Sequence, residues 1–420
     1  MLPFREAEAM RTARILAQGD EITTGATIDT NSAWVAEQLG RYGVRVLGLA
    51  AAPDDVELLA RMLADAARDC DLLVSGGGLG PTTDDVTAEA AARAAGVPLV
   101  ESAEALEQVR ARFARMGRPM SPSNAKQALV PRGAQVLENP AGTAPGFALC
   151  LGAARAFFFP GVPRELRAMV ERHLVPWLAA GGAAPLLRRR FHVCGLGESL
   201  LQDRLADLAL PPGVRLGYQT RLPYNTVLVY GESETREARQ RFEAACEAVR
   251  GRLAEDRFGE DDETLPEVVG RLLLARRWAL ATAESCTAGG TAALVTEVPG
   301  SSAWFRGGVV AYANDVKRDL LGVPAALLER HGAVSEECAE AMAEGVRRAT
   351  LADVGVSLTG IAGPEGGTAE KPVGTVCFAL ALPDGTRTRT VRFPPFGRDR
   401  VRVLAAATAL EWLRRQLGRP

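Results

Sequence analysis

A serine and a lysine in the last third of the chain have the residue types and spacing for amide hydrolysis. Ser285 lies in AESCTAGG (283–290), where an apolar strand stops at a polar turn and a helix is predicted over 287–297. Lys317 lies just inside the next predicted helix, after a strand predicted over 307–313. A lysine removed from water can lose its charge near neutral pH and take the proton of a serine hydroxyl. We therefore predict Ser285 as the nucleophile and Lys317 as its base.

Plainer interpretations of the same residues remain open from spacing alone. Ser285 or Thr287 can simply cap the predicted helix. Lys317 and Tyr312 can be a surface lysine and a half-buried strand tyrosine, although Tyr312 can also hold the lysine or donate a proton. Cys286 is a rival nucleophile, but no histidine is placed to activate it, and cysteine is commonly a small buried residue. Unpaired N–H groups at the helix start would favour an oxyanion beside the serine.

The rarity of lysine in this chain supports the choice of base. Of 49 lysine and arginine residues only Lys126, Lys317 and Lys371 are lysine. Arginine replaces lysine wherever a plain positive charge suffices, but a guanidinium cannot act as a base. A lysine that remains can therefore be one that arginine cannot replace, with chance as the alternative.

A glycine-rich loop and two arginines supply candidate anion contacts in the same segment. LTGIAGPEGG (358–367) follows an apolar strand, and its backbone N–H groups can hold a phosphate or an oxyanion. Arg398 and Arg402 open the last predicted helix and suit phosphate contacts.

A second polar cluster lies near the start of the chain in SGGGLGPTTDDVT (75–87). Glycine amides can cradle phosphate, threonine hydroxyls can bind its oxygens, and paired aspartates can hold a divalent cation. The structural alternative is an N-cap followed by two first-turn acids. The loops at 19–31 and 138–147 also follow strands, so all three should meet at the carboxyl edge of an open α/β sheet.

Hydrophobic periodicity divides the chain into three α/β-type domains. Residues 11–180 alternate strand and helix, which is typical of a parallel sheet covered on both faces. Residues 185–258 have the pattern of a small α+β domain, and residues 263–420 return to α/β alternation with a hairpin around Asp384 and Gly385. GGAAP (181–185) and the acidic, flexible GEDDETLP (259–266) are the predicted boundaries.

Composition excludes several classes of protein. The net charge of -2 gives no global basic field for nucleic acid or an anionic membrane, and LLRRR (186–190) is interpreted as a solvated face. No apolar run is long enough for a membrane helix, and the first residues lack a secretory signal, so we expect a short leader instead. Seven scattered cysteines without a CxxC pair favour a reducing cytoplasm.

Five motifs in the last third resemble one family. AESCTAGG, PGSSAWFRGGVVAY, HGAVS, TGIAGPEGG and EKPVGTV resemble the C-terminal domain of the CinA family (competence/damage-inducible protein A), which also occurs alone as nicotinamide mononucleotide deamidase. The resemblance implies a cofactor-independent serine–lysine dyad, with Tyr312 as a supporting residue. The family usually reads AESCTGG, whereas this chain has Ala288 at the first of those glycines. Together with the motif analysis, the resemblance gives a predicted substrate-binding set of Thr287, Gly289, Ser302, Thr359, Gly360, Gly363, Arg398 and Arg402.

The first segment resembles the molybdopterin-binding fold, a three-layer α/β domain that is also the N-terminal half of CinA proteins. In those relatives the domain is associated with metal-dependent ADP-ribose pyrophosphatase activity. The resemblance implies a divalent metal and pyrophosphate near Asp84 and Asp85. The implied nucleotide site consists of Gly77, Gly78, Thr82, Thr83, Lys126, Asn139 and Gly142.

The middle segment resembles the K-homology-like domain of full-length CinA proteins. Nucleic-acid binding by such domains needs a GxxG clamp and a basic surface, and CGLGES (194–199) does not supply the clamp. We expect a structural or dimerising role, and the family resemblance implies a homodimer.

The leading hypothesis is a bifunctional pyridine-nucleotide salvage enzyme. It would hydrolyse nicotinamide mononucleotide to nicotinate mononucleotide and ammonia, and ADP-ribose at its pyrophosphate. The alternatives are a non-catalytic nucleotide-binding scaffold linked to competence or DNA damage, and a molybdopterin-binding protein.

Overall fold

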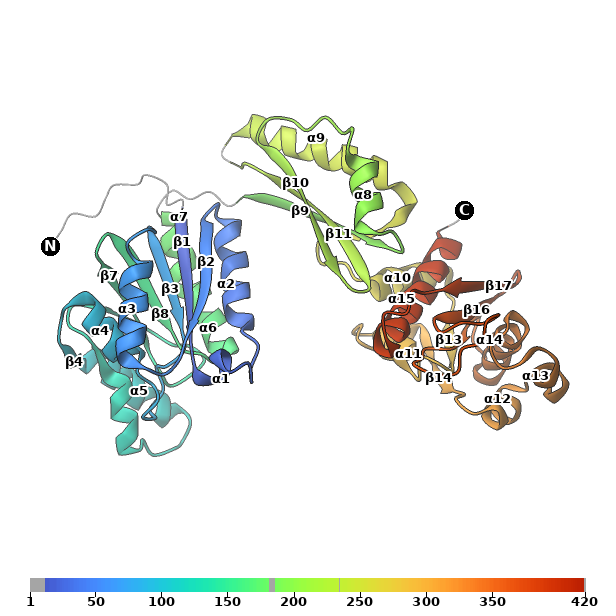
Figure 1. Ribbon diagram of the computed structural model, residues 1–420, viewed down its shortest axis with the longest axis horizontal. Helices are drawn as coiled ribbons and strands as arrows, with labels where there is room; N and C mark the ends of the chain where they lie inside the picture. Colours follow the sequence, from blue (N-terminus) through green and yellow to red (C-terminus); the bar gives the residue numbers. More distant parts are fainter. Residues whose placement is uncertain (1–11, 181–185, 234, 419–420) are drawn as a thin grey trace. The chain divides into compact units, whose positions relative to one another are not determined.

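The chain forms two compact units in the computed structural model, which describes residues 12–180, 186–233 and 235–418 (Figure 1). The first unit contains a six-stranded and a two-stranded sheet, and the second contains a four-stranded and a five-stranded sheet. Most of the predicted leader and the predicted linker at 181–185 lie outside the described residues.

The six-stranded sheet is parallel on one side and antiparallel on the other. Strands β2, β1, β3 and β8 are parallel neighbours in that order, as the alternating pattern predicted. Strands β7 and β6 continue the sheet in antiparallel pairing, which the prediction of a parallel sheet missed. The bounds are β1 (Thr12–Gln18), β2 (Arg45–Ala52), β3 (Leu72–Gly76), β6 (Gln135–Leu137), β7 (Gly146–Leu151) and β8 (Ala154–Phe159).

Helices cover both faces of this sheet, giving the predicted three layers (Figure 1). One core cluster joins α3 and α4 to the sheet through Leu59, Leu63 and Ala90, and another joins α2 and α6 through Val35 and Leu166. The bounds are α1 (Asp20–Thr23), α2 (Thr30–Arg41), α3 (Val56–Ala66), α4 (Thr87–Ala95), α5 (Ala103–Arg115), α6 (Pro163–Met169) and α7 (Val175–Ala180). The short pair is β4 (Leu99–Glu101) with β5 (Leu129–Pro131), and η1 (Pro122–Ala128) is a 3₁₀ helix.

The four-stranded sheet has the strand order β10-β11-β9-β12. The predicted order of strand, helix, two strands and helix is confirmed, but the acidic segment predicted as a flexible boundary begins with a strand, β12. Glu260 in that strand is ion-paired with Arg250 at 2.7 Å and with Arg257 at 2.6 Å, which explains why acidic residues are ordered there. The bounds are β9 (Leu187–Cys194), α8 (Glu198–Leu205), β10 (Val214–Arg221), β11 (Tyr224–Gly231), α9 (Arg236–Leu253) and β12 (Arg257–Glu260).

The basic run at 186–190 is not the solvated face that its composition suggested. Most of it lies in β9, where Arg189 pairs with Asp261 at 3.0 Å and Arg190 pairs with Asp262. The acidic segment therefore neutralises the basic one, which removes the best candidate for a nucleic-acid contact in this sheet.

The five-stranded sheet has the order β14-β13-β15-β16-β17. Its first three strands are parallel, and β16 and β17 form the predicted antiparallel hairpin. The strands are β13 (Leu280–Glu284), β14 (Phe305–Val310), β15 (Val354–Gly360), β16 (Thr375–Leu382) and β17 (Gly385–Arg392). The helices are α10 (Leu265–Arg276), α11 (Gly290–Thr296), α12 (Asn314–Leu321), α13 (Ala325–His331), α14 (Glu336–Thr350) and α15 (Arg398–Leu417).

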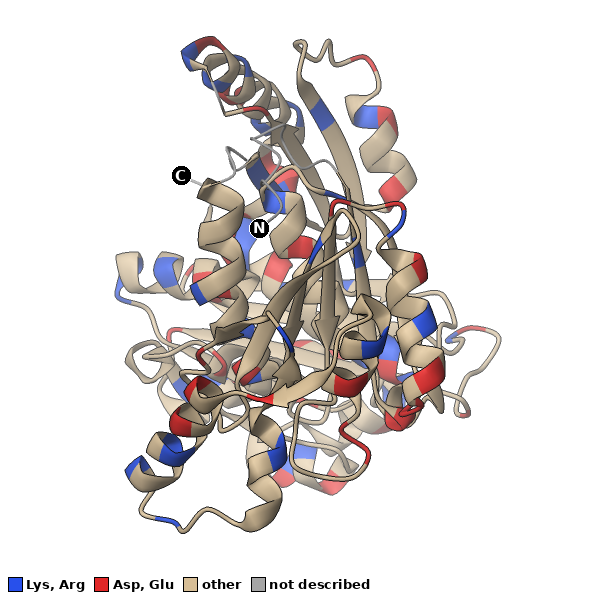
Figure 2. Cartoon of the chain, turned by 90° about the vertical axis from the view of Figure 1, so that its left-hand side faces the viewer, with Lys and Arg blue, Asp and Glu red and all other residues tan. Residues whose placement is uncertain are grey.

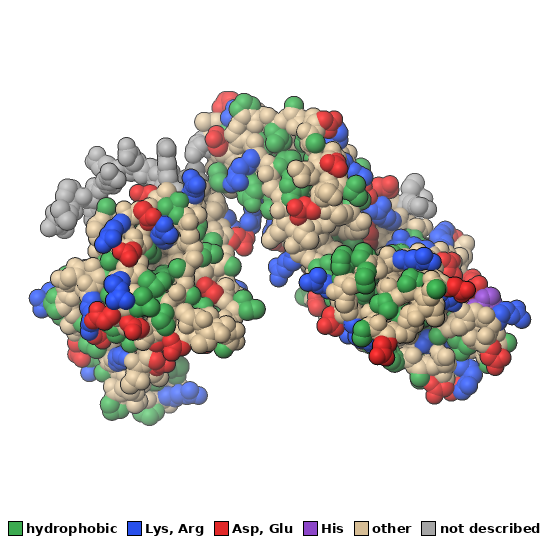
Figure 3. All heavy atoms as spheres, viewed as in Figure 1, with side chains coloured by type: hydrophobic (Ala, Val, Ile, Leu, Met, Phe, Trp, Pro, Cys, Tyr) green, Lys and Arg blue, Asp and Glu red, His purple; other side chains and the backbone are tan. Residues whose placement is uncertain are grey.

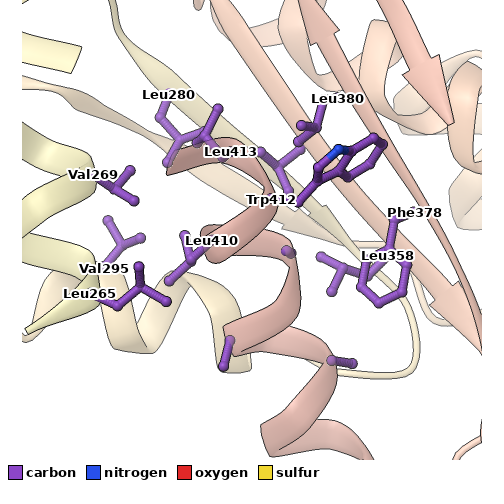
Figure 4. Packing of buried hydrophobic residues seen from close by; sticks show 14 of the residues in the cluster. Leu265, Val269, Leu280, Val295, Leu358, Phe378, Leu380, Leu410, Trp412 and Leu413 are labelled. Carbon is purple, nitrogen blue, oxygen red and sulfur yellow. The ribbon is translucent and has the colours of Figure 1, made fainter. Parts of the chain in front are cut away.

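Helix α15 occupies the centre of the core on one face of this sheet. Figure 4 shows Leu410 directed toward Leu265 and Val295, with Trp412 beside Phe378. The same cluster of buried residues includes Cys194 and Phe258 of the four-stranded sheet. The two sheets of the second unit therefore share one hydrophobic core.

None of the helices in the described residues combines the length and apolar character that crossing a membrane requires. Basic and acidic residues are interspersed along the chain in Figure 2 and over the face that Figure 3 shows.

Candidate active sites

The predicted nucleophile lies at the carboxyl edge of three parallel strands. Glu284, the last residue of β13, is opposite Val310 of β14 and Leu358 of β15. Ser285 follows directly and donates its backbone N–H to the Leu358 carbonyl at 2.9 Å. Residues that follow β14 and β15 therefore meet beside the Ser285 turn, in the position where open α/β sheets hold ligands.

The turn after Ser285 is tighter than the sequence predicted. Ser285 is only 8% exposed, and its carbonyl accepts the N–H of Ala288 at 3.1 Å. Ala288 has φ +50° and Gly289 has φ +90°, so two consecutive residues adopt the left-handed region. Helix α11 consequently begins at Gly290 rather than at 287.

The start of α11 is already occupied by a buried carboxylate. Glu284 is completely buried and accepts the N–H groups of Thr291 at 2.9 Å and Ala292 at 2.8 Å. The prediction that the first turn of this helix offers free N–H groups to an oxyanion is therefore wrong for these two donors. The N–H of Gly289, just outside the helix, has no acceptor among the described residues and remains available.

Lys317 is as desolvated as its predicted role requires. The side chain is 1% exposed, and Nζ donates to the carbonyl oxygens of Ala311 at 2.9 Å and Tyr312 at 3.1 Å. Burial lowers the pKa of Lys317, and no carboxylate is among the groups that shift it. Among the described residues no carboxylate is therefore paired with Lys317 to stabilise its ammonium form.

A chain of hydrogen bonds through one residue, Ala311, connects Lys317 to the residue that precedes Ser285. Ala311, which accepts from Lys317 Nζ, donates its own N–H to the Glu284 carbonyl at 2.8 Å, and Glu284 precedes Ser285. In the described structure Ser285 Oγ and Lys317 Nζ share no direct hydrogen bond. Catalytic hydrogen bonds are commonly long before substrate binds and tighten in the complex.

The rival nucleophile is disfavoured by its surroundings. Cys286 is 5% exposed, and burial raises the pKa of its thiol to about 12. A neutral buried thiol is a poor nucleophile, because the thiolate is the reactive form.

Tyr312 and Arg398 act together at the exposed side of the site. Tyr312 is 57% exposed and accepts a hydrogen bond from Arg398 Nη2 at 2.8 Å, while Arg398 Nη1 donates to the Gly363 carbonyl at 2.9 Å. Tyr312 therefore holds Lys317 through its main-chain carbonyl, and its side chain holds the arginine instead of the lysine. Arg398 connects the loop after β14, the glycine-rich loop and the start of α15.

Two of the predicted substrate threonines are used inside the fold. Thr359 is 1% exposed and donates its hydroxyl to the Ala333 carbonyl at 2.7 Å, so it positions the HGAVS loop. Thr287 is completely buried, and its carbonyl accepts from Arg402 Nη2 at 3.0 Å. Both residues shape the site, and neither side chain reaches its surface in this conformation.

Gly360 is required by close packing rather than by a ligand. A Cβ at this position would lie 2.7 Å from the Thr375 carbonyl oxygen. Gly363 has φ +85° in the loop that follows, which suits glycine.

Ser302 lies at the opposite edge of the sheet, so the structure does not bring it to Ser285 within one chain. It is exposed in a 3₁₀ turn before β14. The six residues of β14 span about 20 Å at ~3.3 Å per residue. Sequence order concealed this separation, because α11 returns the chain to the amino edge before β14 begins.

A second candidate site lies at the carboxyl edge of the six-stranded sheet. A cavity of about 540 Å³ is lined by Gly77, Gly78 and other residues that follow β1, β2, β3 and β8. Its lining includes the carboxylates of Glu21, Asp29, Asp54, Asp84, Asp85 and Glu165, and none of the residues that line it is a lysine or arginine. The predicted convergence of these loops is therefore observed, but the cavity is acidic.

Several predicted nucleotide contacts of this domain instead hold its loops. The Asn139 side-chain N–H groups donate to Ala144 O and Glu165 Oε2, and its Oδ1 accepts from the backbone N–H groups of Ala141 and Gly142. Those four bonds use the hydrogen-bonding capacity of the amide, so Asn139 positions the loop that contains Gly142. These two residues line a smaller hollow of about 220 Å³ instead of the main cavity.

Lys126, Thr82 and Thr83, which were also predicted to contact the nucleotide, likewise make hydrogen bonds within the loops of this domain. Lys126 Nζ donates to the carbonyls of Thr82 and Thr83, the latter at 3.4 Å, and thereby fixes the TTDD turn. Asp85 accepts the N–H of Thr82 at 2.8 Å and also its hydroxyl, so this carboxylate is committed within the turn. Asp84 is exposed.

Gln18 is a central residue of this site that the motif search missed. It is 3% exposed, and its Nε2 donates to Asp54 Oδ1 and to the Asp84 carbonyl, the latter at 3.3 Å. Its Oε1 accepts the Thr87 hydroxyl. A buried polar side chain at the end of the apolar strand ARILAQ was the available signal.

Comparison with known proteins identifies both halves. Residues 14–180 match the family model described as a probable molybdopterin binding domain, and residues 262–417 match that of the CinA C-terminal domain. A CinA-like protein of Desulforapulum autotrophicum is 43% identical over 413 residues, covering 96% of this chain and 98% of its own. A putative competence-damage inducible protein of Symbiobacterium thermophilum is 43% identical over 424 residues, covering 96% and 98%.

A crystal structure of the competence/damage inducible protein CihA from Agrobacterium tumefaciens is 40% identical, covers 37% of this chain and 98% of its own, and has a TM-score of 0.35. The two family models define a protein that joins a molybdopterin-binding-like domain to a CinA C-terminal domain. The chain belongs to the CinA family.

The left-handed Ala288 leads to a prediction about stability. An L-residue in this region costs roughly 1–2 kcal/mol relative to glycine, offset in part by the greater freedom of glycine in the unfolded chain. Ala288→Gly should raise the free energy of unfolding by about 1 kcal/mol and should not reduce activity. Ala293→Gly, at an exposed position inside α11, should lower it by about 1 kcal/mol. Calorimetry of the full chain checks both changes, and equal destabilisation by the two would contradict the strain argument.

Proposed function

We propose that the C-terminal domain hydrolyses the carboxamide of nicotinamide mononucleotide and releases ammonia. The observation that carries this proposal is the way Lys317 is held. A neutral amine has two N–H groups and one lone pair, and the carbonyls of Ala311 and Tyr312 accept two hydrogen bonds from Nζ. The lone pair then remains as the acceptor for a hydroxyl proton.

The reaction follows from that arrangement. Lys317 takes the proton of Ser285 as Oγ attacks the amide carbon, and the N–H of Gly289 is placed to stabilise the oxyanion that forms. The ammonium of Lys317 then returns the proton to the leaving nitrogen, and ammonia departs. Lys317 then deprotonates a water molecule, which attacks the ester carbon of the acyl-enzyme. As the bond to Ser285 Oγ breaks, the lysine ammonium returns the proton to Oγ, and the nicotinate product leaves.

Arg398 and the glycine-rich loop would receive the phosphate of the nucleotide. A guanidinium binds phosphate with two parallel N–H donors, and the hydrogen bonds of Arg398 to Tyr312 and Gly363 would be exchanged for phosphate oxygens. Arg398→Lys should therefore raise KM for nicotinamide mononucleotide about tenfold or more, while kcat falls less. The reason is that the lysine ammonium is a point charge and lacks the planar pair of N–H donors of a guanidinium. A steady-state ammonia assay measures both constants, and an unchanged KM would remove Arg398 from the phosphate site.

The lowered pKa of Lys317 sets a pH dependence. The rate should fall as pH drops through the folded pKa, because protonation removes the base. Between that value and the unfolded value of 10.5 the unfolded chain binds more protons, so stability should rise with pH across this window. Denaturant unfolding of wild type and Lys317→Met at two pH values checks the sign. The destabilisation of wild type relative to the variant should shrink as pH approaches 10.5.

We further propose that the N-terminal domain is a metal-dependent ADP-ribose pyrophosphatase. The acidic lining of its cavity favours this, because a pyrophosphate among carboxylates needs a cation to neutralise the repulsion. The described residues contain no group of three or more metal-ligating side chains, so Asp84 would hold the ion together with substrate oxygens. Divalent ions commonly use one or two carboxylates plus phosphates in this way.

The test of this second activity uses the full chain and ADP-ribose. Hydrolysis should need added Mg²⁺ or Mn²⁺, and Asp84→Asn should lower it on the order of 10²-fold. Glu171→Gln, an exposed residue outside the lining of this cavity, is the control that keeps activity. Binding of a pterin without any turnover of ADP-ribose would favour the molybdopterin alternative.

A further inference from the structure

The helix that follows Ser285 is capped differently from other helices in this protein. Many of those helices are capped by a small polar side chain at the N-cap residue itself, which accepts the N–H three residues later; examples are Asp29, Asp55, Ser102, Thr264 and Ser335. At α11 the N-cap is Gly289, which has no side chain to give. The cap comes instead from Glu284, five residues earlier in β13.

Capping α11 with Glu284 requires a carboxyl group to be completely buried. Its carboxylate is completely buried, and no lysine, arginine or histidine of the described residues forms a salt bridge to it. A buried polar side chain is costly unless it is hydrogen-bonded, and Glu284 accepts the N–H groups of Thr291 and Ala292. A serine or aspartate at the N-cap would perform the structural task locally.

The displaced cap leaves the N-cap residue without a side chain, and a Cβ at Gly289 would lie 3.6 Å from Val310 Cγ2. The N-cap position is a glycine with φ +90°, and its N–H has no acceptor among the described residues. The Glu284 carboxylate fixes the start of α11, so the N–H of Gly289 can donate to a substrate oxygen.

The same residue also organises the base. The Glu284 carbonyl accepts the Ala311 N–H at 2.8 Å, and the Ala311 carbonyl accepts from Lys317 Nζ at 2.9 Å. The side chain of Glu284 therefore fixes the turn that contains Ser285. Its main-chain carbonyl fixes Ala311, whose own carbonyl accepts the hydrogen bond from Lys317.

We propose that Glu284 is the positioning residue of this site, which sets the geometry of the nucleophile and the base together. The inference rests on the proposed serine–lysine chemistry but assigns a role that does not depend on the identity of the substrate. Glu284→Gln tests it with minimal change in shape. A carboxamide has one oxygen for two N–H donors, and its own NH₂ group would face the second donor.

The experiment compares full-length wild type, Glu284→Gln and Glu411→Gln. Glu411 is the matched control: it is also buried in this unit, and its carboxylate accepts from Arg414 and Arg415, on the C-terminal half of α15. The measurements are kcat and KM for ammonia release, the labelling rate of Ser285 by a fluorophosphonate, and the melting temperature. Glu284→Gln should lower kcat and the labelling rate at least tenfold with KM within threefold, whereas Glu411→Gln should lower only the melting temperature.

The outcomes separate this inference from the proposed function. Wild-type labelling without ammonia release, slowed in Glu284→Gln, would remove the substrate assignment and keep the positioning role. Equal labelling of wild type and Glu284→Gln would overturn the positioning role, and so would a wild type that is not labelled at Ser285. If Glu284→Gln does not fold, Glu284→Asp replaces it with the same expectation, because its shorter side chain cannot reach both N–H groups.

Discussion

Replacement of Lys317 by arginine should abolish ammonia release, with kcat falling on the order of 10³-fold or more. Arginine keeps the positive charge and can still donate to the carbonyls of Ala311 and Tyr312, but it cannot give up a proton. The change therefore separates a base from a buried structural cation. Steady-state ammonia release from nicotinamide mononucleotide is the measurement.

The control for this variant must show that the domain is intact. Lys371→Arg is matched, because Lys371 Nζ also donates to a backbone carbonyl, that of His331 at 2.9 Å, and it lies on the same domain. Lys371→Arg should keep near-wild-type activity and both variants should give folded circular-dichroism spectra. Full activity in a folded Lys317→Arg would end the interpretation of Lys317 as the base.

Replacement of Ser285 by alanine should be at least as damaging, again on the order of 10³-fold or more in kcat. The serine is small and 8% exposed, so its loss removes one hydroxyl and little packing. Binding of nicotinamide mononucleotide should persist, because the phosphate contacts proposed for Arg398 are untouched. Calorimetric titration of the variant together with the ammonia assay separates loss of chemistry from loss of binding.

Cys286→Ala is the companion to this experiment. The thiol beside the serine is neutral because burial raises its pKa to about 12, so its removal should leave most of the activity. If Ser285→Ala kept its activity and Cys286→Ala lost it, Cys286 rather than Ser285 would be the nucleophile.

Much of the fold could be predicted from the sequence because its signals are local. Apolar runs such as DLLVSGG and the hairpin residues Asp384 and Gly385 specify strands and turns within a few positions. The antiparallel strands β6 and β7 could not be predicted in the same way, because strand direction depends on which distant partner each edge pairs with. The three residues of β6 are too few to show a period.

The candidate site residues could be predicted only where the position of a residue in the chain, directly after a strand or at the start of a helix, determines where its side chain lies. Ser285, Lys317 and Arg398 are brought to one edge because each follows or opens an element whose direction the alternation predicts. Ser302 was misplaced because its motif adjoins theirs in sequence but lies before β14 rather than after it. Asn139 was assigned to a ligand because sequence does not show that its amide is saturated by its own loop.

Glu284 shows the complementary difficulty. Its position beside the nucleophile was visible, yet a carboxylate within an apolar strand gives no indication of which backbone groups it will meet. Only the register of β13 against α11 and β14 reveals that one residue contacts both halves of the site.

Helix α15 has a consequence for how the second unit comes apart. Its 20 residues extend about 30 Å. Within it, Arg402 donates to the Thr287 carbonyl, and Arg415 pairs with Asp256 at 2.8 Å next to β12. Because Cys194 and Phe258 share its hydrophobic cluster, melting the four-stranded sheet would uncover the helix that also backs the candidate site at Ser285. The two sheets should accordingly unfold in a single cooperative transition. A substitution that destabilises the four-stranded sheet, far from Ser285, should therefore unfold the whole second unit.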